Sequence, residues 1–320
     1  MAGRDFVENK IRVVSVTGPT ASGKTKLAVE LAKEFDGEII SADSMQIYKG
    51  MTIATAKPDE EEKQGIPHHL MGFLEPSQTY SVAMFVSDAS RLIYEISGRG
   101  KLPIICGGTG LYVDSLLNNI KFSEEQRDEK LSSELRNTYE NEGVEGLLSI
   151  LKEFDQPSFD RLKAERNPRR VIRAIEFYKT TGKTITEQIE NSRQEQSPFA
   201  PIKICLNYRS REVLYDRINK RVDIMLRQGL LEEAEKVLKS ELSFTSVKAI
   251  GYKELEPYFK NEKTLEECIE KLKMETRRYA KRQITWFKRD KEANFLYPDD
   301  YQCFEELLAK AVKIIRNYFK

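Results

Sequence analysis

The feature that most restricts what this chain can fold into is a glycine-rich loop near the N-terminus, Gly18-Pro19-Thr20-Ala21-Ser22-Gly23-Lys24-Thr25. It fits G-x-x-x-x-G-K-[ST] at every fixed position. A short β-branched run precedes it at residues 11–16, and apolar residues at helical spacing follow it. A loop between a strand and a helix can turn several backbone N–H groups toward one phosphate at the positive end of the helix. The sequence therefore predicts a site for a diphosphate or a triphosphate.

Two side chains of this loop add chemistry that backbone amides cannot supply. Lys24 brings a full positive charge to the phosphate, and the hydroxyl of Thr25 can hold Mg²⁺. We therefore expect residues 18–25 to bind a diphosphate, with Mg²⁺ as the cofactor and Thr25 as the metal ligand from the protein.

Strand and helix signals alternate around this loop. Apolar runs bounded by turn residues predict strands, and apolar residues three and four apart predict helices. The predicted strands are Ile11–Val16, Glu38–Ser41, Leu102–Cys106 and Ile202–Tyr208, and the predicted helices include one after Gly23, Tyr80–Ile96 and Arg211–Leu226. This alternation indicates an α/β protein, with a P-loop NTPase-like parallel sheet flanked by helices.

The middle of the chain has a different sequence pattern. Strand signals vanish between residues 122 and 197, and charged helical stretches dominate there. We therefore predict a helical insertion domain at 122–197. Residues 1–121 are expected to form the first part of the core, and 198–320 to supply a core strand and the C-terminal helices that complete it.

Two more loops are expected to reach the phosphate site, because ligands of open parallel sheets lie outside the carboxyl ends of the strands. Asp43 follows the second predicted strand, and residues 107–110, Gly-Gly-Thr-Gly, follow the third. Asp43 can be a Mg²⁺ ligand, a base that takes a proton from a nucleophile, or a turn aspartate. Thr109 can bond a substrate or shape the turn.

Charge is distributed unevenly along a chain whose net charge is only +1. Residues 271–291 contain nine Lys or Arg and two acids, and residues 161–173 contain six Lys or Arg and one acid. Such tracts suggest a positioned anionic partner, although solvated helix faces explain them equally well. Tyr279, Trp286 and Phe287 lie among the charges of the first tract, and helical spacing favours core positions for Trp286 and Phe287.

The remaining signals restrict location and metal content. No apolar run approaches the roughly 18 residues that cross a bilayer, and residues 1–10 lack a signal-peptide core. The four cysteines show no C-x-x-C spacing, so reduced thiols are expected. His68 and His69 are the only histidines, and residues 66–70 are predicted to form a structured loop rather than a zinc site. We expect a cytoplasmic monomer without a membrane partner.

Seven ordered blocks then resemble one family, the bacterial-type tRNA dimethylallyltransferases, also called tRNA isopentenyltransferases. They extend over nearly the whole chain, and together they are far more specific than the phosphate loop alone. The blocks are residues 18–25, 43–50 (DSMQIYKG), 107–112 (GGTGLY), 168–174 (PRRVIRA), 217–223 (RINKRVD), 249–254 (AIGYKE) and 276–283 (TRRYAKRQ).

The resemblance implies an activity and a set of site residues. The family transfers a dimethylallyl group from its diphosphate to N6 of the adenosine next to the anticodon on its 3′ side. The implied partners are dimethylallyl diphosphate and the tRNA anticodon stem-loop. The implied catalytic residues are Asp43 as the base for the adenine amine, Thr109, Lys24, Arg217 and Arg221. The implied tRNA contacts are Asp43, Ser44, Met45, Gln46, Thr109, Arg127, Arg169, Arg170, Val171, Ile172, Arg173, Arg277, Arg278, Lys281 and Arg282.

One position departs from the family pattern, because residue 169 is Arg where the family commonly has Gln. A phosphate contact is more compatible with arginine there than a base contact. Three other functions compete. A small-molecule kinase shares the phosphate loop and a functional Asp43. An enzyme that prenylates free adenine nucleotides shares the chemistry, and a non-catalytic RNA-binding switch would use the loop for regulation.

Overall fold

The structure, a computed structural model, describes residues 10–120, 128–194 and 196–319. The chain forms two compact units: one joins Met1–Leu117 to Pro198–Lys320, and the other comprises Asn118–Ser197. The first unit holds a parallel sheet and the second is helical. Among the described residues, no helix is both long enough and apolar enough to span a membrane.

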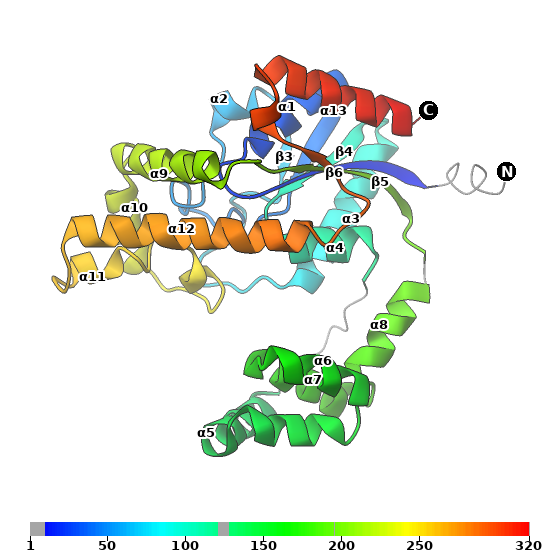
Figure 1. The fold of residues 1–320 in the computed structure, drawn as a ribbon, viewed down its shortest axis with the longest axis vertical. Helices are drawn as coiled ribbons and strands as arrows, with labels where there is room; N and C mark the ends of the chain where they lie inside the picture. The colour runs from blue at the N-terminus through cyan, green and yellow to red at the C-terminus, as the bar shows by residue number, and fades with distance from the viewer. Residues whose placement is uncertain (1–9, 121–127, 195, 320) are drawn as a thin grey trace. The chain divides into compact units, whose positions relative to one another are not determined.

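The larger unit is built on a six-stranded sheet with the order β3-β2-β4-β1-β5-β6 (Figure 1). Every pairing is parallel. The strands are β1 (Ile11–Thr17), β2 (Gly37–Ser41), β3 (His68–His69), β4 (Leu102–Gly107), β5 (Phe199–Leu206) and β6 (Asn294–Leu296). β1 lies between β4 and β5, so the loop that follows it leaves from the middle of the sheet. The predicted P-loop NTPase-like fold class is confirmed.

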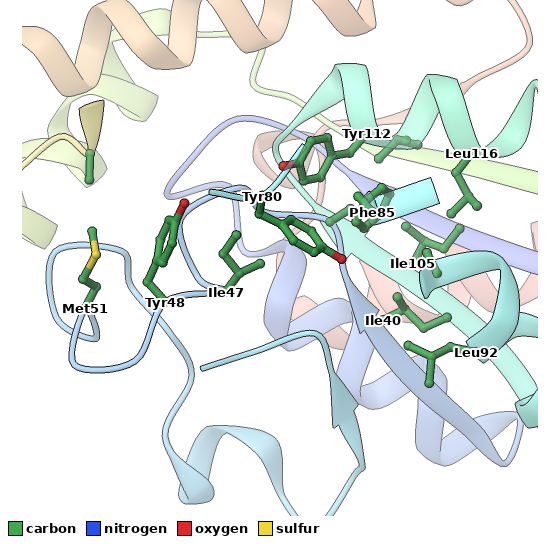
Figure 2. Packing of buried hydrophobic residues seen from close by; sticks show 14 of the residues in the cluster. Ile40, Ile47, Tyr48, Met51, Tyr80, Phe85, Leu92, Ile105, Tyr112 and Leu116 are labelled. Carbon is green, nitrogen blue, oxygen red and sulfur yellow. The ribbon is translucent and has the colours of Figure 1, made fainter. Parts of the chain in front are cut away.

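Helices cover both faces of this sheet, which explains why its central strands are almost continuously apolar. Successive residues of β1 point to opposite faces, so Val13 joins one core and Val14 the other. α1 (Lys24–Glu34) and α13 (Phe304–Tyr318) pack on the Val14 side, and α3 (Val82–Gly98) and α4 (Gly110–Leu117) on the Val13 side. In the core on the Val13 side, Phe85 stacks on Tyr112 with 4.4 Å between ring centroids (Figure 2).

The C-terminal helices extend the Val13 core beyond the sheet. They are α9 (Arg211–Arg227), α10 (Leu230–Leu238), α11 (Glu256–Phe259) and α12 (Leu265–Phe287). Another short helix, α2 (Glu60–Lys63), lies earlier in the chain. α12 begins at a capping box, in which Thr264 and Glu267 satisfy each other's backbone N–H groups. It lies beside α9 and α4, and its Cys268 and Leu272 belong to the core (Figure 1). Gly229 is the N-cap of α10.

The helical unit has a hydrophobic core of its own. Its helices are α5 (Glu129–Lys152), α6 (Gln156–Glu165), α7 (Pro168–Thr181) and α8 (Ile185–Gln194). Leu147, Leu151, Val171 and Ile175 are fully buried in it. The carboxylate of Asp155 caps α6 and accepts a 2.6 Å hydrogen bond from Thr186 Oγ1 at the start of α8. This unit begins at Asn118, close to the boundary at residue 122 that the sequence predicted.

Two short strands were missed by the sequence prediction. The predicted loop at residues 66–70 contains β3, whose two histidines pair with Ile39 and Ile40 of β2. The C-terminal part of the chain, which was expected to supply one core strand followed by helices, also contains β6. Strands of two and three residues are too short to display alternation, and their pairing is set by the sheet edges they meet. The fourth predicted strand also begins earlier, at Phe199.

A buried carboxylate holds the edge of the sheet at β3. Glu38 in β2 accepts hydrogen bonds from His69 Nε2 and Arg99 Nη2, each at 2.7 Å. Its side chain is only 6% exposed. Burial alone would raise the pKa of Glu38, but the hydrogen bonds and charges of Arg99 and His69 outweigh burial, so the pKa lies below its ordinary value of 4.5. The ionised form therefore stabilises the fold.

We predict that Glu38→Gln lowers the free energy of unfolding at pH 7 by about 1–3 kcal/mol, because a buried charged acceptor is lost. A depressed folded pKa contributes stability above the unfolded value, which is lost as the pH falls through the folded pKa. The difference between wild type and variant should therefore shrink below about pH 4, as measured by urea unfolding. Glu75→Gln, which breaks an exposed pair with Lys49, is the control and should cost less than about 1 kcal/mol. A difference that is constant from pH 7 to pH 3 would contradict this account.

Candidate active site

The loop between β1 and α1 has the curled backbone that phosphate binding needs. Gly18, Ala21 and Gly23 have φ values of 147°, 62° and 89°. A Cβ at Gly18 would lie 2.6 Å from the carbonyl oxygen of Leu206 in β5, so only glycine fits there. Gly23 is the N-cap of α1 and gives no side-chain cap. The first N–H groups of α1 are therefore left for an external anion.

Two cations face the same pocket as this loop. Lys24, the first residue of α1, donates a hydrogen bond to the carbonyl oxygen of Pro19 at 3.4 Å. Burial lowers the pKa of Lys24, and the charge of Arg221 on α9 lowers it further. Burial also lowers the pKa of Arg221. Two partly desolvated positive charges close together favour a ligand with several negative charges.

Asp43 lies in the turn that follows β2. Its Oδ1 accepts hydrogen bonds from the backbone N–H groups of Met45 at 2.9 Å and Gln46 at 3.3 Å. Its Oδ2 accepts no hydrogen bond from the residues that the structure describes. The turn thus fixes the carboxylate through one oxygen, and Asp43 lines the pocket. It combines the turn role and the position that a base would need.

Residues 107–110 join this turn from the neighbouring strand end. The N–H of Thr109 donates to the carbonyl oxygen of Ala42 at 3.1 Å, and its Oγ1 accepts from the N–H of Ser44 at 3.0 Å. A Cβ at Gly107 would lie 2.1 Å from the Ala42 oxygen, so a side chain there would force the two segments apart. Thr109 therefore holds the Asp43 turn, and it contacts the pocket residue Tyr279.

A third wall of the pocket is the segment at residues 54–56. The side-chain amide of Gln46 donates to the carbonyl oxygens of Thr55 and Ala56 at 3.2 and 3.1 Å. Glu233 on α10 accepts from the backbone N–H groups of residues 52–54 and from the hydroxyl of Tyr252. The sequence analysis missed Glu233, because the backbone groups that it binds lie 179 to 181 positions away in the chain.

Charged and apolar side chains both line the pocket. The polar lining includes Lys24, Thr25, Asp43 and Arg221. The apolar lining was missed by the sequence analysis. It comprises Ala54, Ile218, Val222, Met225, Leu230, Ala249, Ile250 and Leu272. Such a site fits a molecule that joins a polyanion to a short hydrocarbon.

The two candidate arginines of α9 are placed differently. Arg221 lines the pocket, whereas Arg217 lines a neighbouring surface groove. The Nε of Arg217 donates to the carbonyl oxygen of Ala21 at 3.0 Å, and its guanidinium lies 5.6 Å from the ring centroid of Tyr208. Arg217 thus stabilises the backbone of the phosphate loop at Ala21, and Arg221 is the arginine whose side chain lines the pocket.

The basic tract lies on α12 and the residues just after it. Arg282 lines the pocket. Arg277 donates to Asn219 on α9 at 2.6 Å, Arg278 pairs with Glu275 at 2.7 Å, and Lys281 is exposed. Phe287 is buried as predicted. The tract is therefore partly structural, and its exposed charges surround the pocket residues of α12.

The helical unit carries the other basic tract. Arg169, Arg170 and Arg173 are exposed on α7. Val171 is fully buried in the core of this unit, which excludes an RNA contact through its side chain, and Ile172 packs partly against that core. Arg127 lies outside the described residues.

No group of three or more His, Cys, Asp or Glu side chains in the described part of the chain could hold a metal ion. Thr25 and Asp43 are oxygen-bearing side chains in the polar lining of the pocket. Mg²⁺ commonly takes few protein ligands and completes its shell with phosphate oxygens and water, so this donor set fits a magnesium diphosphate.

Two family models match the chain. IPP transferase matches residues 46–290, and isopentenyl transferase matches residues 11–71. The first match covers well over half of the chain. The chain belongs to the IPP transferase family. The resemblance inferred from the motifs is thereby confirmed.

Curated relatives and solved structures agree with this membership. A tRNA dimethylallyltransferase from Thermoanaerobacter sp. strain X514 is 47% identical over 311 residues, which are 95% of this chain and 98% of the relative. A tRNA isopentenylpyrophosphate transferase from Bacillus halodurans is 40% identical, with a TM-score of 0.71 over 97% of this chain and 98% of that one. A eukaryotic dimethylallyltransferase acting on tRNA is 30% identical, with a TM-score of 0.80 over 96% of this chain and 80% of that one.

We predict that Lys24→Met weakens binding of inorganic pyrophosphate at least about tenfold, because the charge nearest the phosphate loop is lost. Affinity of the wild type should fall as the pH rises through the lowered pKa of Lys24, and the variant should lack this dependence. Isothermal titration calorimetry measures both effects. The matched control is Lys26→Met, since Lys26 is exposed on the same helix and lies over the ring of Phe304, 4.1 Å from its centroid. Equal losses in both variants would contradict a specific role for Lys24.

Proposed function

We propose that this protein transfers a dimethylallyl group from dimethylallyl diphosphate to N6 of the adenosine next to the anticodon of tRNA, on its 3′ side. The single observation that carries the proposal is that one pocket is lined both by cations at and near the phosphate loop and by apolar side chains of α9, α10 and α12. The diphosphate matches the cations, and the five-carbon chain matches the apolar side chains. The names of the relatives agree with this reading.

The proposed chemistry is a substitution at the allylic carbon. The bond between that carbon and the diphosphate oxygen breaks, the bond to N6 forms, and the N6 proton passes to the carboxylate of Asp43. Lys24, Arg221 and the amides at the start of α1 stabilise the charge that develops on the departing diphosphate. Thr109 and the turn it holds keep Asp43 at the rim of the pocket.

Mg²⁺ fits the polar lining of the pocket, and Thr25 would hold it together with oxygens of the diphosphate. When bound, it would neutralise part of the charge of the leaving group. Arg217 is assigned a supporting role, since it bonds the loop backbone at Ala21 rather than facing the pocket.

The RNA is proposed to meet two basic surfaces. One comprises Arg277, Arg278, Lys281 and Arg282 on α12, and the other comprises Arg169, Arg170 and Arg173 on α7. The target adenine must leave the base stack and enter the pocket next to the bound donor, as enzymes acting on bases require. Ser44, Met45 and Gln46 stand beside Asp43 at that point. A cytoplasmic location and a monomeric state remain predictions from the sequence.

A kinase is the main rival, because it would use the same phosphate loop. The apolar side chains that line the pocket match a hydrocarbon chain, and this favours the prenyl donor. Incubation with dimethylallyl diphosphate, Mg²⁺ and unmodified tRNA separates the two. Prenylated adenosine should appear in the tRNA without ATP, whereas phosphoryl transfer from ATP to a metabolite would sink the proposal.

We predict that Asp43→Asn lowers the rate constant for transfer by about 10²- to 10⁴-fold, the range that a positioned base contributes. Asparagine keeps the Oδ1 acceptor of the turn, so tRNA affinity should change less than about threefold. Single-turnover transfer and filter binding measure the two quantities. Asp43→Ala, which also removes the turn acceptor, should lose stability as well as rate. A near-normal rate in the asparagine variant would show that Asp43 is not the base.

The basic surface of α12 predicts a salt effect. Arg278→Gln with Lys281→Gln removes two exposed charges and leaves the Arg277–Asn219 bond intact. The slope of log affinity for tRNA against log salt should fall in magnitude by about 1 to 2. Lys310→Gln with Lys313→Gln, two exposed lysines on α13, is the matched control and should leave the slope unchanged. Identical slopes in both double variants would assign the α12 charges to solvent.

A further inference from the structure

The C-terminal half of α12 contacts the phosphate loop, residues 107–110 and α4 with residues that recur about one helical turn apart. Tyr279 contacts Thr109. Gln283 reaches both the phosphate loop and Gly108. Trp286 donates from Nε1 to Asp114 on α4 at 2.6 Å. One face of one helix thus lies along the segments that would carry the leaving group and the acceptor.

Gln283 makes the only hydrogen-bonded link, within the described residues, that ties the phosphate loop to residues 107–110 through one side chain. Its Oε1 accepts from the N–H of Thr20 at 2.8 Å, and its Nε2 donates to the carbonyl oxygen of Gly108 at 3.0 Å. The residue is only 5% exposed. Both ends of the amide are therefore used inside the protein, shielded from water, where such bonds hold their geometry best.

The amide of Gln283 occupies the space that a side chain at Gly108 would need. A Cβ at Gly108 would lie 2.1 Å from Gln283 Nε2. The Gly108 backbone is outside the left-handed region, so alanine is conformationally acceptable there. The atom it would meet is the end of a flexible side chain, so the substitution would displace the amide rather than the backbone.

We propose that Gln283 is a positioning residue that sets the placement of the diphosphate cradle relative to the Thr109 loop, and through Thr109 relative to Asp43. The proposal rests on the function proposed above. Thr109 bonds the Asp43 turn at Ser44, so hydrogen bonds joined by short backbone segments connect Thr20 to the base. Transfer requires the donor carbon, the acceptor nitrogen and the base in one alignment, and small displacements of such groups cost large factors in rate.

The bridge also restricts which amides can hold the diphosphate. The N–H of Thr20 is committed to Gln283, and the N–H of Ser22 turns toward the carbonyl oxygen of Pro19 at 3.3 Å. Loss of Gln283 should therefore alter alignment more than affinity for the diphosphate, which the start of α1, Lys24 and Arg221 would still bind. This separates positioning from substrate binding in an experiment.

The test compares Gln283→Ala and Gly108→Ala with the wild type, using full-length protein, dimethylallyl diphosphate, Mg²⁺ and unmodified tRNA. Prenylated tRNA and free diphosphate are measured in the same reaction. In both variants the rate constant for transfer should fall at least about tenfold, while KM for the donor changes less than about threefold. The ratio of transfer to diphosphate release should fall below that of the wild type, because water then captures the allylic carbon as dimethylallyl alcohol.

Two controls keep the result specific. Cys268→Ala removes a fully buried side chain of the same helix that does not line the pocket; it should lower the melting temperature without changing the ratio. The double variant Gln283→Ala with Gly108→Ala should be no slower than Gln283→Ala alone, because the clash needs the amide. Additive losses in the double variant would contradict the proposed role of Gln283. A ratio of transfer to diphosphate release that is the same in Gln283→Ala as in an active wild type would also contradict it. A wild type that forms no prenylated tRNA would instead refute the proposed function.

Discussion

Parallel pairing around β1 is the constraint on which the site depends. Thr17 pairs with Gly107 on one side and with Cys205 on the other, and Ser41 pairs with Cys106. The loops after β1, β2 and β4 therefore leave the sheet at the same level, although they are far apart in sequence. Even a short side chain at Gly107 or Gly18 would push the strand ends apart, since each glycine lies against a backbone carbonyl oxygen of a neighbouring segment. The pocket exists because glycine allows the strand ends to meet.

The electrostatic character of the pocket follows from that convergence. Lys24 lies on α1 and Arg221 on α9, two helices far apart in the sequence, and burial lowers the pKa of each. Burial of these two charges is unfavourable without a ligand, although the charge of Asp43 favours the charged form of both. A bound diphosphate would reduce this cost and add hydrogen bonds from the start of α1. The polar lining is thus arranged for an anion more highly charged than a single carboxylate.

Much of this arrangement could be predicted from sequence because it depends on local patterns. The β-branched run at β1, the loop motif and the apolar spacing of α1 and α3 are all short-range signals, and the fold class followed from their order. The edge strands β3 and β6 could not be predicted, since two or three residues carry no period and the sheet itself recruits them. Asp43 and Lys24 were found because they sit at strand and helix ends, whereas Glu233 and Gln283 act on backbone groups that are distant in sequence.

The bridge formed by Gln283 shows why the missed part concerns function more than fold. Thr20 and Gln283 are separated by 263 positions, so no local pattern relates them, yet their bond fixes the edge of the pocket. Closing so long a connection is entropically unfavourable, and α12 achieves it by burying Cys268, Leu272 and Phe287 along the same helix. The apolar contacts dock the helix, and the docked helix then aims a polar amide with little remaining freedom. In this protein the hydrophobic core of the C-terminal helices therefore determines the geometry of a polar site built mainly from N-terminal loops.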